Sequence, residues 1–474
     1  MRRKWRELGF ILFLPFEIAL GIFKPFLPNL SPLGHWIIVS VLITTTIWIL
    51  EPFGISLGVG GIAFMAMALI LGVPAEDVFS GFTQSAIWTL VPALFFGVAL
   101  QKTGLGTRIV YFMLRFTKVS YLSLLFVWTI IGIALSFLTP SITVRIVIIT
   151  PLALECANLC GLPERSKERS LLLLTTWAMS VIPGIGWSTG TLMGPILTGI
   201  FSSVEGIPPI SFADWARVSL LPAVLVTVFL FTGGYWVLRP KQKLSISKQV
   251  FQTAYRNLPR ATRQEKGTAA ILTLCFILFA TSSWHHIPDA AVCMTGFLLL
   301  CGTGVISRQD ISTGISWDLI LFVGASMGFG SVFATSGVSA WLSDNLSVLL
   351  QPVAAHPWLF VYSVLIFLFI WRLLDVALLT PTIVMIAPVI PTLGAEFGIH
   401  PLVWIPLFSM AICAFFFPYE SMFCLICEAE MKSRGWLGSH RFCYACIYFI
   451  ACLAALLIAV PYWESIGIFQ YMPA

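Results

Sequence analysis

Long apolar stretches cover almost the whole chain, from Phe10 to Pro461, and polar positions are confined to short segments between them. A window of about twenty apolar residues is long enough to cross a bilayer as a helix. The pattern predicts eleven crossings, near 10–28, 36–50, 53–72, 86–103, 171–201, 216–238, 267–281, 289–306, 317–336, 401–430 and 442–461. Two further apolar segments, 120–155 and 358–395, are predicted to enter the membrane and return as re-entrant hairpins.

Each predicted hairpin is broken in its middle by a short polar, proline-containing segment. These breaks are Leu138-Thr139-Pro140-Ser141 and Leu379-Thr380-Pro381-Thr382, about half a chain apart. Within a bilayer, unpaired backbone groups are tolerated only where they face protein or a water-filled cavity. Interrupted segments at matching positions of two halves are typical of the binding site of an inverted-repeat transporter. The breaks therefore predict the place of a substrate site.

The distribution of charge supports an all-α polytopic membrane protein. Of the 474 residues 58% are hydrophobic and only 10% are charged, whereas soluble domains carry about a quarter charged residues. With a cytoplasmic N-terminus, the predicted inner segments hold 23 of the 27 Lys and Arg residues. The predicted outer segments hold none, which agrees with the positive-inside rule. We therefore expect a multi-pass protein of the cell (inner or plasma) membrane, with its N-terminus cytoplasmic and its C-terminus outside.

The chain is predicted to consist of two halves built on one plan. Residues 1–238 form the first repeat and 267–474 the second, joined by a basic cytoplasmic linker, 239–266. Each hairpin is followed by a helix that polar or small residues interrupt, at 183–191 within 171–201 and at 417–421 within 401–430. An odd number of crossings separates equivalent elements, so the repeats are inverted. The site is then expected near the bilayer midplane, between hairpin tips and broken helices.

Several motifs resemble those of the divalent anion:sodium symporter (DASS) family of dicarboxylate, citrate and sulfate carriers, in the ion transporter superfamily. They are Ala99-Leu-Gln-Lys-Thr-Gly-Leu-Gly-Thr-Arg108, Trp317-Asp-Leu-Ile-Leu-Phe-Val-Gly-Ala325, Gly394-Ala-Glu-Phe-Gly-Ile-His-Pro401 and the first tip, Thr139-Pro-Ser-Ile-Thr-Val-Arg145. The resemblance implies a homodimer in the lipid bilayer that moves a small anion by an elevator motion. It implies no cofactor, with Na⁺ as the candidate coupling ion.

The family's signature is Ser-Asn-Thr at each hairpin tip, where it contacts substrate carboxylates. Ser141, Thr143 and Arg145 align with the first tip, and Ile142 stands in place of Asn. The second signature falls on Leu378-Leu379-Thr380, of which only Thr380 matches. Further predicted substrate contacts are Thr382 and Ser421. The predicted cation-binding or coupling residues are Gly184, Gly186, Thr189, Thr191 and Glu420.

Charged residues inside the membrane are costly, by about 2.5–3.5 kcal/mol on insertion scales, and mark pathways or pairs. Arg145 is interpreted as a substrate ligand ahead of a structural bond to hairpin carbonyls. Arg372 precedes Asp375 by three residues, which favours a salt bridge on one helix face. Glu420 has two equal interpretations. It is either a protonatable coupling group or a carboxylate hydrogen-bonded to amides freed at the helix break.

The sequence therefore predicts a secondary active transporter, a symporter or exchanger, of small anions, with dicarboxylates favoured. The alternatives are an anion channel or transport-dead receptor on the same scaffold, or a sulfate or sulfonate carrier coupled to protons. No Ser-His-Asp, His-rich or paired-acid arrangement predicts an enzyme, and no pattern predicts a nucleic-acid partner. The spacing of Cys424, Cys427, Cys443 and Cys446 formally matches a zinc site, but both pairs lie in apolar helical runs, which favours helix packing.

Overall fold

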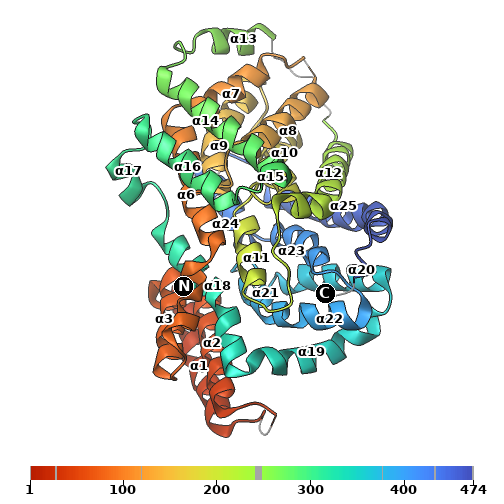
Figure 1. Ribbon diagram of the computed structural model, residues 1–474. Coiled ribbons are helices and arrows are strands. Elements are labelled where there is room, and N and C mark those ends of the chain that lie inside the picture. Colours follow the sequence, from red (N-terminus) through yellow and green to blue (C-terminus); the bar gives the residue numbers. More distant parts are fainter. Residues whose placement is uncertain are drawn as a thin grey trace.

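The protein is described by a computed structural model over residues 2–26, 29–118, 120–240, 248–375, 377–431 and 434–471. These residues form helices joined by short segments, without any strand in the described part (Figure 1). Eight of the described helices are long and apolar enough to cross a membrane. Both arms of the first predicted hairpin are among the eight. Length and composition alone therefore do not separate crossing helices from hairpin arms, and the number of crossings stays a prediction.

The helices of the first half are α1 (Arg2–Phe23), α2 (Pro32–Leu50), η1 (Pro52–Gly54), α3 (Leu57–Ile70), α4 (Ala75–Val78), α5 (Ser80–Thr83), α6 (Ser85–Lys102), α7 (Leu105–Leu114), α8 (Tyr121–Leu138), α9 (Ile142–Leu159), α10 (Lys167–Val181), η2 (Pro183–Gly186), α11 (Met193–Ser202) and α12 (Phe212–Val237). The predicted first hairpin is α8 and α9. The predicted broken helix is α10 and α11, separated by η2 and a loop.

The helices that follow are α13 (Lys248–Arg256), α14 (Arg263–Ala280), α15 (Ser282–His285), α16 (Asp289–Gly302), α17 (Arg308–Thr313), α18 (Trp317–Ser336), α19 (Val338–Ala354), α20 (Pro357–Trp371), α21 (Thr380–Ile386), η3 (Ala387–Val389), α22 (Ile390–Phe397), η4 (Pro401–Val403), α23 (Trp404–Ile412), η5 (Pro418–Glu420), α24 (Met422–Met431) and α25 (Gly438–Ser465). The predicted second hairpin corresponds to α20, α21 and α22, and the predicted second broken helix to α23 and α24.

Polar residues begin the helices that form the first hairpin and its neighbour. The side chains of Ser120, Ser141 and Ser166 each accept a hydrogen bond from a backbone amide in the first turn of α8, α9 and α10. These caps satisfy amides that a helix leaves without intrahelical partners. The predicted interruption at residues 138–141 falls where α8 ends and α9 begins, whereas α10 begins four residues before the predicted window at 171.

Helices of the two halves pack against one another. α12 lies along α25, the last long helix of the other half (Figure 1). α3 of the first half packs on α18 of the second, and α6 of the first half packs on α16 of the second. Each half thus contributes a helix that completes the other half's bundle. This exchange joins the halves into one body around the hairpins.

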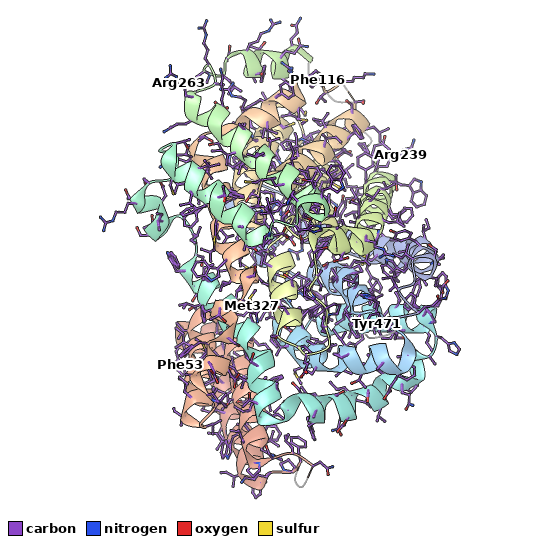
Figure 2. All side chains as sticks on the ribbon, in the orientation of Figure 1. Phe53, Phe116, Arg239, Arg263, Met327 and Tyr471 are labelled. Atoms are coloured by element: carbon purple, nitrogen blue, oxygen red, sulfur yellow. The ribbon has the colours of Figure 1, made fainter. Side chains whose placement is uncertain are left out.

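The structure describes residues 239–240 and 248–266 of the basic linker. Lys241 and Lys243 of the linker lie outside the described residues, as do residues 27–28 of the first predicted span. Within the described part, α13 packs on α7, and α14 begins at Arg263. Figure 2 shows Phe116, Arg239 and Arg263 toward one end of the molecule.

Candidate functional site

The first hairpin tip is a tight turn held by its own hydroxyl groups. Thr139 Oγ1 accepts a hydrogen bond from the Ser141 amide at 3.1 Å, and Ser141 Oγ accepts one from the Val144 amide at 3.4 Å. The next residue, Ile142, is buried, and Thr143 is half-buried on the first turn of α9. The predicted contacts Ser141 and Thr143 therefore both lie at the tip, with Ser141 also capping the helix.

The second tip has a strained backbone. Leu378 and Leu379 adopt φ angles of 58° and 55°, in the left-handed region that costs a residue with a branched side chain about 1–2 kcal/mol. Asparagine tolerates this region better than leucine. Thr380 begins α21 with its side chain fully buried and its hydroxyl without a partner among the described atoms. The tip thus presents one free hydroxyl group, from the one signature residue that is retained here.

The first broken helix brings two glycines against each other. A Cβ atom on Gly184 would lie 2.5 Å from the carbonyl oxygen of Gly190 and 3.3 Å from Nη1 of Arg145. Side chains larger than hydrogen would therefore push this loop apart. Gly186, in η2, instead faces α12. Of the two glycines predicted to line a cation site, Gly184 adjoins the hairpin arginine and Gly186 does not.

Arg145 is fully buried and carries a charge that no carboxylate balances. Its Nη2 donates a hydrogen bond to the carbonyl of Gly190 at 2.8 Å. Nε and Nη1 are buried without a partner among the described atoms, and no described carboxylate lies within ion-pair distance. The structural bond thus runs to the broken helix rather than to hairpin carbonyls, and two donor atoms remain free.

Arg372 bonds to carbonyl groups instead of forming the predicted ion pair. Its two Nη atoms donate to the backbone carbonyls of Asp375 and Glu420. The carboxylate of Asp375 turns to Thr382, accepting from its amide at 3.2 Å and from its hydroxyl. The two residues are close, but the expected salt bridge between their side chains is replaced by main-chain bonding, because Thr382 supplies better-placed donors for the carboxylate.

Thr382 is consequently held within the hairpin. Its hydroxyl donates to Asp375 and accepts from the Trp371 indole at 2.9 Å. A hydroxyl with both partners in place stabilises the turn that supports the second tip. Thr380, two residues earlier, keeps its hydroxyl free.

Glu420 lies in the second broken helix, buried to 1% exposure. Its Oε2 accepts a hydrogen bond from the Phe417 amide at 3.3 Å, which is the predicted bond to an amide freed at the break. Its Oε1 has no partner among the described atoms. The adjacent Ser421 accepts from the Cys424 amide at 3.3 Å and begins α24. The carboxylate therefore supports the break and retains one free oxygen.

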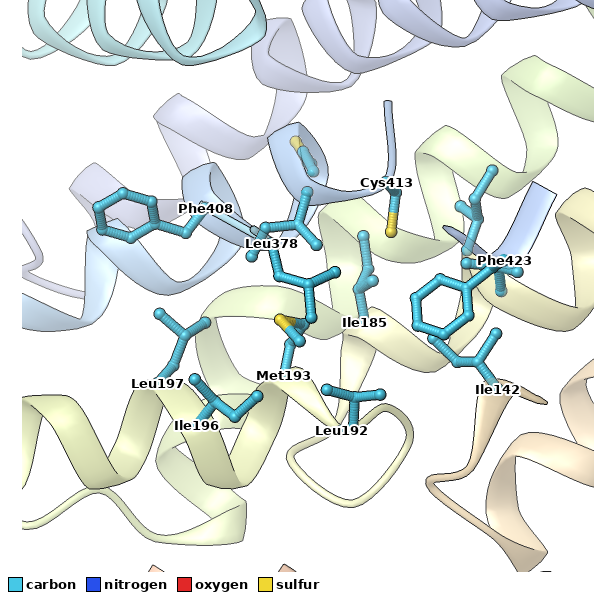
Figure 3. Close-up of a cluster of buried hydrophobic side chains, with 14 of the residues drawn as sticks. Ile142, Ile185, Leu192, Met193, Ile196, Leu197, Leu378, Phe408, Cys413 and Phe423 are labelled. Carbon is cyan, nitrogen blue, oxygen red and sulfur yellow. The ribbon is translucent and has the colours of Figure 1, made fainter. Parts of the chain in front are cut away.

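A closed cavity of about 10 Å³, room for about one water molecule, lies between the first tip and the broken helices. Polar groups reach it only from Thr191, Ser409, Cys413 and Ser421. Figure 3 shows Ile142, Ile185, Met193, Leu378 and Phe423 within one buried apolar cluster at this place. The positions where the family signature has polar residues are thus filled by apolar side chains, and the centre is tightly packed.

A larger, open cavity of about 600 Å³ adjoins the first broken helix. We call it the vestibule. Ser188 and Thr189 form part of its wall, and their buried hydroxyl groups have no partner among the described atoms. The other polar residues that line it are Ser85, Thr89, Thr198, Ser202, Ser211, Ser282, Ser283, His286 and Asp289.

Three of the predicted site residues line one of these two cavities. Thr191 and Ser421 line the closed cavity, whereas Thr189 lines the vestibule. Ser188, Ser409 and Cys413 were not predicted. Ser188 lies in the small-residue interruption between Pro183 and Thr191 and could have been found there. Ser409 and Cys413 lie in an apolar helical run that gives no local signal.

Cysteines of the formal zinc pattern lie on two helices. Cys424 and Cys427 are buried on α24, and Cys443 and Cys446 are half-buried on α25. Among the described residues, no three His, Cys, Asp or Glu side chains are grouped as a metal site. Cys427 instead lies 3.3 Å from the hydroxyl of Thr150 on α9. Cys427 thus takes part in the packing of α24 on α9.

Known proteins resemble this chain over most of its length. It is 24% identical to the sodium-dependent dicarboxylate transporter SdcS of Staphylococcus saprophyticus, over 85% of this chain and 81% of that protein. It is 22% identical to the chloroplastic dicarboxylate transporter 1 of Spinacia oleracea, over 75% of this chain. The chain covers 64% of the spinach protein, less than two thirds of its length.

A similar fold occurs in the crystal structure of the YdaH transporter of Alcanivorax borkumensis, with a TM-score of 0.55 and 14% sequence identity over 83% of this chain and 89% of that one. At this identity the likeness concerns the fold alone. Residues 5–469 match the family described as the sodium:sulfate symporter transmembrane region. The chain therefore belongs to this divalent anion:sodium symporter family of multi-pass membrane transporters, which are not enzymes.

Proposed function

We propose that the protein is a secondary active transporter of small dicarboxylates. The observation that carries the proposal is Arg145, a fully buried guanidinium with two free donor atoms and no carboxylate partner. An uncompensated buried charge is strongly unfavourable. A bound carboxylate would balance it, since guanidinium groups match carboxylates in a two-point geometry. The names of the relatives, which are dicarboxylate transporters, support the same substrate class.

The remaining contacts are proposed from the tips and the broken helices. Thr380 offers a free hydroxyl from the second tip. Ser421, which lines the closed cavity, contributes a hydroxyl that already accepts from the Cys424 amide and can still donate. Ser141 and Thr143 lie at the start of α9, whose amide end favours an anion. A dicarboxylate needs far more room than about 10 Å³, so binding requires the tips and broken helices to separate. This requirement supports an alternating-access carrier rather than an open channel.

The vestibule is proposed as the outer path to the site. Its rim includes residues 282–288 and the segment before α12, which the charge pattern places outside with a cytoplasmic N-terminus. Its inner wall carries the free hydroxyls of Ser188 and Thr189. A homodimer moving its hairpins and broken helices in an elevator motion, in the plasma membrane, is part of the same proposal.

Sodium fits as the coupling ion, because one family description and one relative's name both specify it. In this chain the carbonyls of Gly190 and Glu420 already accept hydrogen bonds from Arg145 and Arg372. These two carbonyls are therefore not available to a cation, which leaves Thr189, Thr191 and the Glu420 carboxylate as the predicted ligands. Two alternatives to sodium coupling are proton coupling through Glu420 and exchange of the substrate for an internal anion.

The test is uptake of radiolabelled succinate into proteoliposomes, with the sodium gradient, the proton gradient and internal succinate varied independently. We expect saturable uptake and counterflow, meaning that unlabelled internal succinate accelerates entry of labelled succinate. Counterflow distinguishes a carrier from a channel or a receptor. Absence of both saturable uptake and counterflow for succinate, citrate and sulfate would refute the proposal.

A further inference from the structure

An apolar groove lies between α7, α8 and α14. Its volume is about 460 Å³, within the range of pockets that hold small ligands, about 300–1,000 Å³. The lining side chains are almost entirely apolar and include Leu105, Ile109, Phe112, Met113, Phe137 and Phe276. The groove is open on one side, so a long apolar molecule can enter it laterally.

A basic pocket of about 390 Å³ adjoins the groove at the end of α7. It is lined by Arg115, Phe116, Gln252, Tyr255 and Arg256. Tyr255 lines both spaces, so the pocket and the groove adjoin at this side chain. The pocket lies under α13, within the linker that carries eight Lys and Arg residues. The apolar groove therefore ends beside a positively charged pocket.

Arg115 is held in this pocket as a free cation. Its guanidinium carbon lies 4.1, 4.6 and 4.7 Å from the ring centres of Phe112, Phe116 and Tyr255. Its Nε is buried without a partner among the described atoms. Neither Arg115 nor Arg256 has a described carboxylate within ion-pair distance, whereas the nearby Arg108 is paired with Glu265. Three rings thus fix a guanidinium whose charge remains available to an anion.

We propose that the groove and the basic pocket together bind one anionic phospholipid of the cytoplasmic leaflet. An acyl chain would lie in the groove, and the phosphate would bind Arg115 and Arg256. Charge complementarity favours this occupant, since basic pockets between membrane helices on the cytoplasmic side suit anionic lipid head groups. A zwitterionic lipid would fill the groove equally well but would leave the arginines uncompensated.

The bound lipid would contact the element that carries the first tip. Phe137 and Leu138 line the groove and are the last two residues of α8, immediately before Thr139. The Phe137 ring also stacks on Trp187 of the first broken helix, with ring centres 4.3 Å apart. An acyl chain in the groove would therefore limit how far the first hairpin can move.

The experiment is native mass spectrometry of the full-length detergent-purified protein with dioleoylphosphatidylglycerol or dioleoylphosphatidylcholine. We expect at least about tenfold preference for phosphatidylglycerol. The double variant Arg115→Gln/Arg256→Gln should lose this preference, and Ile109→Trp, which fills the groove, should weaken binding of both lipids. Glycerol phosphate, a soluble head-group analogue, should not compete at equal concentration.

The matched control is Arg239→Gln/Arg263→Gln, which removes two basic residues near the linker without touching either space. Equal loss of preference in this control would show a diffuse positive surface and would overturn the proposal. Competition by glycerol phosphate, or unchanged binding in Ile109→Trp, would also overturn it, by indicating a soluble-anion site or an unoccupied groove. Size-exclusion chromatography of each variant, compared with wild type, checks that the protein is folded. Arg115→Lys is a milder alternative that keeps the charge but loses the planar stacking.

Discussion

Arg145 and Arg372 have the same relation to the broken helices of their own halves. Arg145 donates to the carbonyl of Gly190, between α10 and α11, and Arg372 donates to the carbonyl of Glu420, between α23 and α24. Each hairpin is thus bonded to the interruption that follows it in the chain. Only Arg372 has acidic neighbours, Asp375 and Glu420, so the two arginines differ in charge balance.

Substitution of Arg145 should weaken substrate binding even when the positive charge is kept, because the two-point hydrogen bonds of the guanidinium are lost. A hydrogen bond to a charged group contributes about 1.5–3 kcal/mol, so losing one weakens binding about tenfold to a hundredfold. We expect Arg145→Lys to raise the KM for succinate by at least about tenfold, and Arg145→Gln to abolish uptake. Arg6→Gln, which removes an exposed arginine paired with Glu51, is the control and should transport normally. Normal uptake by Arg145→Gln would exclude Arg145 as the substrate ligand.

Restoring asparagine at the tips should strengthen the dependence on sodium. Leu379 is fully buried with φ of 55°, a conformation that asparagine adopts more readily. An amide oxygen would also supply a ligand that leucine lacks. We expect the melting temperature of Ile142→Asn/Leu379→Asn to rise with NaCl by more than that of the wild type. Choline chloride at the same ionic strength controls for screening, and an equal rise in both salts would contradict the prediction.

The vestibule should admit water-soluble reagents to the first broken helix. Ser188→Cys and Thr189→Cys are expected to react with a membrane-impermeant maleimide added from outside, and saturating substrate should slow the labelling. Wild-type protein gives the background from its native cysteines. Thr176→Cys, on buried α10 away from the vestibule, should stay unlabelled in the folded protein. Labelling of Ser188→Cys only from the cytoplasmic side would place the vestibule on the opposite face.

Acid should weaken the contact between α6 and the segment before α18. Lys102 donates to Asp310 at 2.5 Å, and this bond, with those from Ser307, lowers the pKa of Asp310 from 3.8 to about 2. Because the folded pKa is the lower one, the stabilisation is complete above about pH 4 and is lost as the pH falls toward 2. Asp310→Asn should reduce the melting temperature at pH 7 and remove this part of its acid dependence. The Lys102 side chain is 44% exposed, so the effect should be small and should shrink in high salt.

The helices and their interruptions could be predicted from the sequence, because apolar length, proline and glycine act locally. The interval 317–336 coincides with α18, and both predicted tips lie at helix ends. The side-chain partners could not be predicted in the same way. Arg372 lies three residues before Asp375, but the carboxylate bonds Thr382, since the fold of the tip returns that residue to it. The pairing of Gly184 with Gly190 likewise depends on how the broken helix closes.

The closed cavity shows a second reason why the site could not be predicted in full from the sequence. The sequence indicated that Ile142 and Leu379 replace polar signature residues, but not that the space between the tips would be filled by their apolar neighbours. The packing of Ile185, Met193 and Phe423 around one cavity depends on the placement of η2, α11 and α24, which no local pattern encodes. For the same reason, Ser409 and Cys413, which lie within an apolar run, could not be recognised as cavity-lining residues from the sequence.

The exchange of helices between the halves sets an order for biosynthesis. α3 and α6 leave the ribosome early, yet the helices that cover them, α18 and α16, are made more than 180 residues later. Until then their apolar faces must be shielded by lipid or by the insertion machinery. A chain stopped within the linker should therefore be degraded when expressed alone. Co-expression with the remaining fragment should rescue it, because the second fragment brings both missing covers.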